Sequence, residues 1–174
     1  MRLTLALLAV LCAASAASVT AGLSLGPVFP AGGWGDNISA GLDLRAYGRW
    51  MFSEAFGAGP GLALTMHGDA YDGDASLTVL TPEVSAAYHL RPGARSFSPG
   101  LEVGAGCSRS RLEAGGGSDP VTWDPFWRAG VCWEFGLGAG LRGAAGFDFR
   151  GIIASEESAD GFALVFRVSR EVLR

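Results

Sequence analysis

The chain has 174 residues, of which 49% are hydrophobic and only 17% are charged, and 27 of them are glycines. This composition excludes a disordered chain and disfavours an ordinary water-facing surface, because few polar side chains are available to cover one. The net charge of −4 leaves no broad basic face for phosphates, so we do not expect nucleic-acid binding. The length fits one domain.

The N-terminal residues have the pattern of a targeting signal. Arg2 supplies a positive charge, an apolar stretch follows as far as Leu11, and small residues suitable for cleavage come next. We expect residues 1–17 to be a signal peptide, with cleavage as late as residue 21 left open, and residues 18–170 to form one domain. No later run of about 18 apolar residues exists, so a membrane-embedded chain would have to cross as a closed barrel.

The mature sequence alternates with period two, which predicts β-strands. The clearest case is residues 127–137. Its apolar face carries Trp127, Ala129, Val131, Trp133, Phe135 and Leu137. Its other face carries Arg128, Gly130, Cys132, Glu134 and Gly136. The same split recurs in segments that begin near residues 22, 41, 61, 80, 101, 141 and 162. We predict an all-β protein, an antiparallel up-and-down transmembrane β-barrel of about eight strands, with ten left open.

The connections between these segments alternate in length, which orients the barrel. The short ones lie near residues 53–54, 91–93 and 138–140. The longer polar ones lie at residues 30–38, 68–74, 112–122 and 151–160. Short periplasmic turns and longer external loops are typical of outer-membrane barrels, so both ends of the barrel chain should face the periplasm.

Alternation alone does not say which face points outward, because a soluble lipocalin-like barrel inverts the pattern. The polar face is mostly Gly, Ala, Ser and Thr, which suits a narrow lumen better than a water-facing exterior. Aromatic residues also cluster where two interfacial girdles would lie, namely Trp50, Phe52, Phe56, Tyr88 and Phe135 near the short turns and Trp127 near a long loop. We therefore predict that the apolar face meets lipid.

Three Gly-rich stretches, residues 22–30, 98–106 and 143–149, resemble the barrel family that includes the transmembrane domain of OmpA-like proteins. The resemblance implies an outer-membrane location in a Gram-negative cell, contact with outer-membrane lipid, and insertion by the barrel-assembly machinery. Gly161, Leu164 and Phe166 match part of the family's C-terminal assembly signal. The motifs specify architecture better than activity.

Charged residues of the predicted inward face form the main candidate site. They are Asp43, Arg45, Arg49, Glu83, His89, Glu102, Arg128, Glu134, Arg142, Asp148, Arg150 and Arg167. Acids and bases are nearly balanced, and in a narrow lumen they must pair, so removing Glu134 or Arg142 should destabilise the barrel or admit water. Arg109 and Arg111 have outward parity near an external loop, which predicts contacts with lipid phosphates if the strand extends that far.

Other motifs give weaker hypotheses. Gly22–Gly26 matches GxSxG, followed by Asp43 and His67 in hydrolase order, but the nearby prolines and the uninterrupted alternation predict a lumen-facing Ser24. His67 and His89 could serve a lipid-modifying barrel enzyme, the main functional alternative beside a soluble binding barrel. We expect no catalytic residues, cofactor or metal.

Two local expectations follow from side-chain parity. Cys107 and Cys132 have opposite parity, so they should remain free thiols. A serine in place of the inward Gly130 should be mild.

The sequence therefore predicts a monomeric, non-enzymatic outer-membrane scaffold that displays loops, with a largely plugged lumen and at most weak porin-like activity.

Overall fold

The computed structural model describes residues 18–32, 38–70, 75–90, 97–114, 117–118, 121–153 and 158–173. The expected signal peptide, residues 1–17, lies outside the described residues. The strands are β1 Ser18–Ala31, β2 Gly41–Met51, β3 Phe56–Ala70, β4 Ala75–His89, β5 Ser98–Ala114, β6 Gly117–Ser118, β7 Thr122–Gly138, β8 Leu141–Ile153 and β9 Ser158–Leu173. Within these residues, no helix has the length and apolar character needed to cross a membrane.

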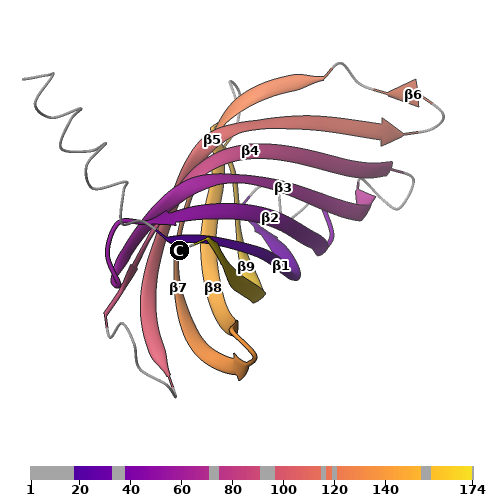
Figure 1. Ribbon diagram of the computed structural model, residues 1–174. Coiled ribbons are helices and arrows are strands. Elements are labelled where there is room, and N and C mark those ends of the chain that lie inside the picture. The colour runs from indigo at the N-terminus through magenta and orange to yellow at the C-terminus, as the bar shows by residue number, and fades with distance from the viewer. Residues whose placement is uncertain are drawn as a thin grey trace, which may run out of the picture.

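Eight long strands form a closed antiparallel barrel, as the sequence predicted (Figure 1). Each strand pairs with its neighbour in the chain, and β1 closes the wall by pairing with β9, for example Leu23 with Val168. The two-residue β6 pairs antiparallel with the last residues of β5, Ser118 with Glu113 and Gly117 with Ala114. The up-and-down order leaves no open edge among the long strands, which is what a barrel in lipid requires.

The two ends of the barrel differ in their connections. One end, which we call the turn end, carries the tight turns 52–55 and 139–140. The side chain of Ser53 accepts hydrogen bonds from the backbone of Ala55 and Phe56 at 3.3 and 3.0 Å, which fixes the first turn. In the second turn, Ala139 and Gly140 have φ of 51° and 75°, as a type I′ hairpin requires. The opposite end, the loop end, carries β6 (Figure 1).

The strands run further toward the loop end than predicted. β1 continues to residue 31, β3 to residue 70, β5 to residue 114 and β8 to residue 153, so all four expected long loops are partly strand. These residues were expected in loops because the segments that contain them are polar. Backbone pairing has no such requirement, since the ladder of amide hydrogen bonds forms whatever the outward side chain is.

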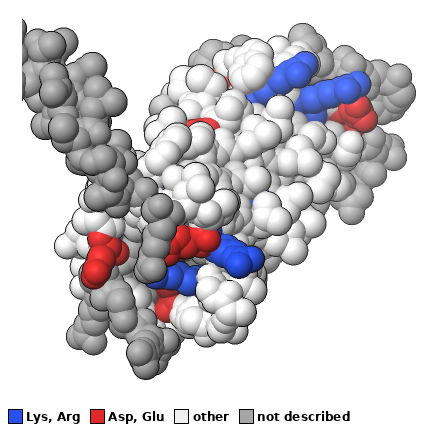
Figure 2. All heavy atoms as spheres, viewed as in Figure 1, with Lys and Arg blue, Asp and Glu red and all other residues white. Residues whose placement is uncertain are grey.

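The apolar face points outward and the polar face fills the lumen. Along β4 the exposed Pro82, Val84 and Tyr88 alternate with the buried Glu83 and Ser85. On the face shown in Figure 2, charged side chains are gathered at the two ends and the surface between them is almost free of charge. This arrangement excludes the soluble lipocalin-like alternative, in which the apolar residues would be inside.

The predicted aromatic girdle at the turn end is largely in place. Trp50, Phe52, Phe56 and Tyr88 are exposed on the outer surface, whereas Phe135 is half-buried. Near the loop end Trp127 is half-buried beside Phe149, with ring centroids 5.5 Å apart. Aromatic side chains at these two levels suit the two membrane interfaces.

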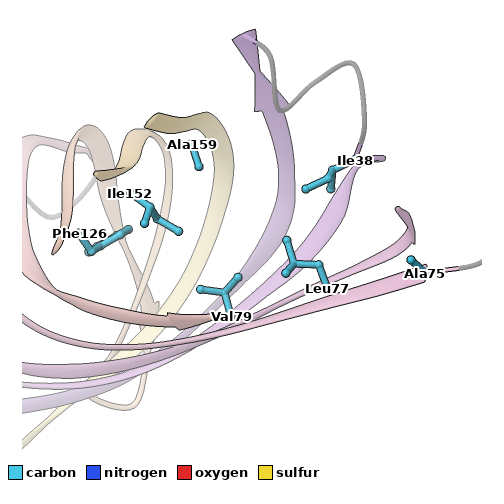
Figure 3. Packing of buried hydrophobic residues seen from close by; sticks show 7 residues of the cluster. All are labelled: Ile38, Ala75, Leu77, Val79, Phe126, Ile152 and Ala159. Atoms are coloured by element: carbon cyan, nitrogen blue, oxygen red, sulfur yellow. The ribbon is translucent and has the colours of Figure 1, made fainter. Parts of the chain in front are cut away.

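The loop end of the lumen is apolar. A cluster of buried side chains, the loop-end cluster, is contributed by the segment before β2 and by strands β4, β7, β8 and β9: Ile38, Ala75, Leu77, Val79, Phe126, Ile152 and Ala159 (Figure 3). Burial of such side chains from several walls of the barrel excludes water and stabilises that end.

The space around Gly130 corrects one expectation. A Cβ atom at this inward position would lie 2.1 Å from Oδ1 of Asp148 and 2.6 Å from the backbone oxygen of Phe147. The adjacent strand approaches too closely for any side chain there, so a serine at Gly130 should not be mild.

Candidate functional site: the charged lumen

Nine ionisable side chains in the middle of the lumen form one connected set, which we call the lumen network. Every member is at most 8% exposed, and the members are Asp43, Arg45, Arg49, Glu83, Glu102, Arg128, Asp148, Arg150 and Arg167. They come from β2, β4, β5, β7, β8 and β9, because each of these strands alternates inward and outward residues.

Arg128 is the centre of the network. Its Nε lies 3.0 Å from Oε2 of Glu83, and its Nη1 lies 3.2 Å from Glu102 and 3.4 Å from Asp148. Arg45, from the facing strand β2, lies 3.5 Å from Glu83 and 3.4 Å from Asp148. The guanidinium groups therefore bridge carboxylates on several walls, which is the planar recognition that arginine allows.

Asp43 is the carboxylate on the loop-end side of the network. Its Oδ1 accepts hydrogen bonds from Nη1 of Arg150 and from the hydroxyl of Thr65, both at 2.7 Å. β2 and β8, which carry Asp43 and Arg150, are not neighbours in the sheet, so this pair spans the lumen. Buried charges of this kind are tolerable only when paired and hydrogen-bonded.

Glu102 is the carboxylate on the turn-end side of the network. It accepts hydrogen bonds from Arg49 at 3.1 Å, from Arg128 at 3.2 Å and from Nη2 of Arg167 at 2.8 Å. The ring of Tyr47 contacts two of these cations, with the guanidinium carbons of Arg49 and Arg167 each 5.1 Å from its centroid. Such cation–π contacts add to the pairing of charges that have left water.

The remaining predicted lumen charges lie nearer the turn end and are less tightly joined. Nδ1 of His89 and Nη1 of Arg142 lie 3.7 and 3.6 Å from the same carboxylate oxygen of Glu134. The side chain of Arg142 is 60% exposed, so it is not the buried partner that the sequence led us to expect. The cost of removing Arg142 should therefore be that of a surface ion pair.

A chamber of about 510 Å³ opens at this end of the lumen. We call it the turn-end chamber; its wall includes Thr20, Tyr47, Arg49, His89, Glu134 and Ser169. At the opposite side of the lumen network, a cavity of only about 40 Å³ separates Arg150 from the loop-end cluster, which is room for a few water molecules. The lumen is therefore wide at the turn end and narrow beyond the network.

Arg109 and Arg111 lie on the outer surface in strand β5, not in a loop. Arg111 lies 3.0 Å from Glu113, and both side chains are more than half exposed. The guanidinium of Arg109 lies 6.0 Å from the ring centroid of the exposed Trp123. The structure thus sets two cations beside an aromatic residue at the loop end of the outer surface.

The weaker motifs point to structural roles. Ser24 is 2% exposed and faces the lumen within β1, and no helix follows it among the described residues. Both histidines are buried, and Nδ1 of His67 lies 2.9 Å from the backbone oxygen of Ser39. Cys107 is exposed and Cys132 is buried, and both thiols are free.

Sequence reasoning missed several polar partners of the network. Thr65 donates a hydrogen bond to Asp43, Tyr47 contacts two arginines, and the hydroxyls of Thr81 and Ser108 lie 2.8 Å apart. Their inward parity was visible in the alternation, but their partners are on other strands and depend on the stagger of the barrel.

The closed wall, the apolar exterior and the charged interior define a transmembrane β-barrel of the small outer-membrane type. No family model and no curated protein sequence matches the chain. Solved structures do match: Neisserial surface protein A has a TM-score of 0.70 at 10% identity, over 88% of this chain and 97% of that one. OprG of Pseudomonas aeruginosa has a TM-score of 0.61 at 13% identity, over 90% of this chain and 97% of that one.

The N-terminal barrel domain of Pseudomonas aeruginosa OprF gives a TM-score of 0.55 at 11% identity, over 87% of this chain and 96% of that one. At these identities the likeness concerns the fold. The predicted resemblance to small outer-membrane barrels is confirmed at that level.

Proposed function

We propose that the protein is a monomeric outer-membrane scaffold with a plugged lumen, whose turn end faces the periplasm and whose loop end is displayed outside the cell. In this proposal residues 1–17 direct export, and the barrel-assembly machinery inserts the rest. The fold shared with outer-membrane barrels and the apolar exterior support the location.

The lumen network is the main observation that supports a plugged lumen. Its pairs join strands that are not neighbours, such as Arg150 with Asp43 and Arg49 with Glu102, so the side chains cross the lumen from wall to wall. An ion passing through would have to separate buried pairs, which is costly because a charge left alone there is poorly solvated. The loop-end cluster closes the path a second time with apolar side chains.

Planar-bilayer recording tests the plug. The wild-type barrel should show no large, steady conductance, whereas Arg128→Ala should open a path because it removes the guanidinium that joins three carboxylates. Arg109→Ala is the matched control, since it removes an outward arginine from the same barrel. Steady porin-like conductance of the wild-type protein would refute the plug.

The buried histidines argue against a lipid-modifying enzyme. His67 and His89 are 3% and 4% exposed inside the lumen, away from the outer surface where acyl chains lie. We therefore propose no catalytic role; an altered lipid A or phospholipid profile in a host expressing His89→Ala instead of the wild-type protein would contradict this.

Arg109 and Arg111 support a second role for the outer surface, namely contact with lipid phosphates. Cations at the level of an exposed tryptophan suit the headgroup layer, where arginine can bind phosphate oxygens. Vesicles that contain phosphatidylglycerol should stabilise the wild-type barrel against urea more than pure phosphatidylcholine does. The double variant Arg109→Gln, Arg111→Gln should lose this difference, whereas Glu113→Gln should keep it.

A further inference from the structure

The chain contains only two histidines, and both lie inside the lumen. His67 lines the small cavity on the loop-end side of the lumen network, and His89 lines the turn-end chamber. Histidine is the side chain that ordinarily changes its charge between about pH 5 and pH 8. We propose that these two histidines make the plug sensitive to acid, so that their protonation loosens the lumen network and lets ions pass. This regulation rests on the plug proposed above.

The buried charges of the lumen are balanced while the histidines are neutral. The five arginines of the lumen network are matched by its four carboxylates together with Glu134, whose side chain is 12% exposed. The sixth lumen arginine, Arg142, is 60% exposed, so water solvates it. Protonation of both histidines therefore adds two positive charges that no carboxylate buried in the described lumen is left to match.

His67 shares its cavity with an arginine. Its Nδ1 donates a hydrogen bond to the backbone oxygen of Ser39 at 2.9 Å, because a carbonyl can only accept, so an added proton goes to Nε2. Arg150 and the half-buried Asp160 line the same cavity. Asp43 is the buried carboxylate near the ring, but both of its oxygens already bind Arg150. The charge of protonated His67 therefore falls beside a buried cation whose carboxylate is taken.

His89 has the same kind of surroundings on the turn-end side of the network. Glu134 is 3.7 Å from its Nδ1, but the same carboxylate oxygen also pairs with Arg142 at 3.6 Å. Glu102 already accepts hydrogen bonds from three arginines. Protonated His89 therefore competes with Arg142 and repels Arg49. The ionisable groups around the ring are Arg49, Glu102, Cys132, Glu134 and Arg142, with the exposed Glu54 and Glu171 at the mouth of the chamber.

Each histidine adjoins one of the ion pairs that cross the lumen. His67 lies near the pair of Arg150 with Asp43, and His89 lies near the pair of Arg49 with Glu102. These are the pairs that a passing ion would have to separate. Repulsion between an imidazolium ring and the neighbouring arginine weakens both pairs at once. Closure of the lumen therefore depends on neutral histidines on both sides of the network.

Planar-bilayer recording and urea unfolding at two pH values test the proposal. The wild-type barrel should be closed at about pH 7.5 and conduct at about pH 5.5, where histidine ordinarily carries a charge. Its urea midpoint should be lower at the acid pH by roughly 0.5 M or more, because the added charges disfavour only the folded state. Carboxylates keep their charge over this range, since their ordinary pKa values are about 4.

The double variant His67→Asn, His89→Gln removes both titrating groups and keeps an amide donor in place of each ring. It should fold, which heat-modifiable migration in SDS gels checks, and it should stay closed with one urea midpoint at both pH values. The outward variant Cys107→Ser is the control and should open in acid like the wild-type protein. If the double variant does not fold, the imidazole NMR signals of the wild-type barrel decide, because both rings should titrate together with the conductance.

The possible failures are distinct. Wild-type protein that stays closed at both pH values, or whose midpoint falls without conductance, overturns the proposal. Acid opening that persists in the folded double variant overturns it as well, as do histidine rings that titrate without any change in conductance. Steady conductance of the wild-type protein at neutral pH refutes the plug itself, and the regulation with it.

Discussion

Glu102 is the residue whose loss should most disturb the lumen. Its carboxylate accepts hydrogen bonds from Arg49, Arg128 and Arg167, and the side chain is 1% exposed. The substitution Glu102→Gln keeps the shape and removes the charge. Arg128 would retain Glu83 and Asp148, whereas among the described residues Arg49 and Arg167 have ion pairs only with Glu102.

The size of the effect follows from these contacts. Breaking a buried ion pair by removing one partner typically costs about 3 to 5 kcal/mol, because a charge is left without compensation. The amide oxygen of glutamine still accepts one hydrogen bond and Tyr47 still contacts both arginines, so we expect the lower end, about 3 kcal/mol. That loss corresponds to a change of roughly 100-fold in the folding equilibrium.

Urea unfolding of the refolded barrel in detergent, followed by tryptophan fluorescence, measures the loss. With a slope of roughly 1 to 3 kcal/mol per molar urea, the midpoint should fall by at least about 1 M. Glu113→Gln is the matched control: it makes the same change on the same strand, in an ion pair whose partners are 57% and 53% exposed. Such a surface pair contributes about 0 to 1 kcal/mol.

Equal midpoints for the two variants would refute the reasoning. They would mean that the lumen is wet enough for water to replace Glu102, and the plug would lose its physical basis. A lower midpoint together with new conductance in bilayers would instead link the same ion pairs to stability and to closure.

Three further outcomes follow from the two faces of the wall. Val131→Arg puts a charge in lipid and should lower the free energy of unfolding by about 2 to 4 kcal/mol. If the variant were as stable in vesicles as the wild-type protein, the two faces of the wall would be inverted. Gly130→Ser should lower the urea midpoint and Gly48→Ser should not, since a Cβ at Gly48 meets no atom within 4 Å; equal midpoints would contradict the close approach at Gly130. N-ethylmaleimide should modify Cys107 in the folded mature chain and Cys132 only after boiling in SDS; an intramolecular disulfide in the mass spectrum would contradict their opposite parity.

The alternation of the sequence was sufficient to predict the wall of the barrel. In β7, Ala129, Val131 and Trp133 point outward and Arg128 and Cys132 point inward, as their parity required. Parity is a local property, because successive side chains of any strand lie on opposite faces. The direction of each side chain can therefore be predicted without knowing which strands pair.

Partners across the lumen could not be predicted in the same way. That Arg150 binds Asp43 and Arg167 binds Glu102 depends on the stagger of the strands and on the length of each arginine side chain. Stagger accumulates around the barrel from every register and bulge, for example the irregularity between Val19 and Thr20 in the β1–β9 pair. A small change in register moves each inward residue to another level, and the sequence pattern does not record that level.

The loop-end cluster was predictable in principle, and its position argues for a lumen with two different ends. Leu77 and Val79 share the parity of the inward Glu83, and Phe126 shares that of Arg128, so apolar side chains stand on the lumen face near one end of their strands. An inward apolar residue meets no lipid, so it stabilises the barrel only if the opposite wall also supplies apolar side chains. The turn end supplies Arg49 and a wide polar chamber instead. Among the described residues, the lumen is therefore wide and polar at the turn end and packed with apolar side chains at the loop end, and this asymmetry opposes free passage through the barrel.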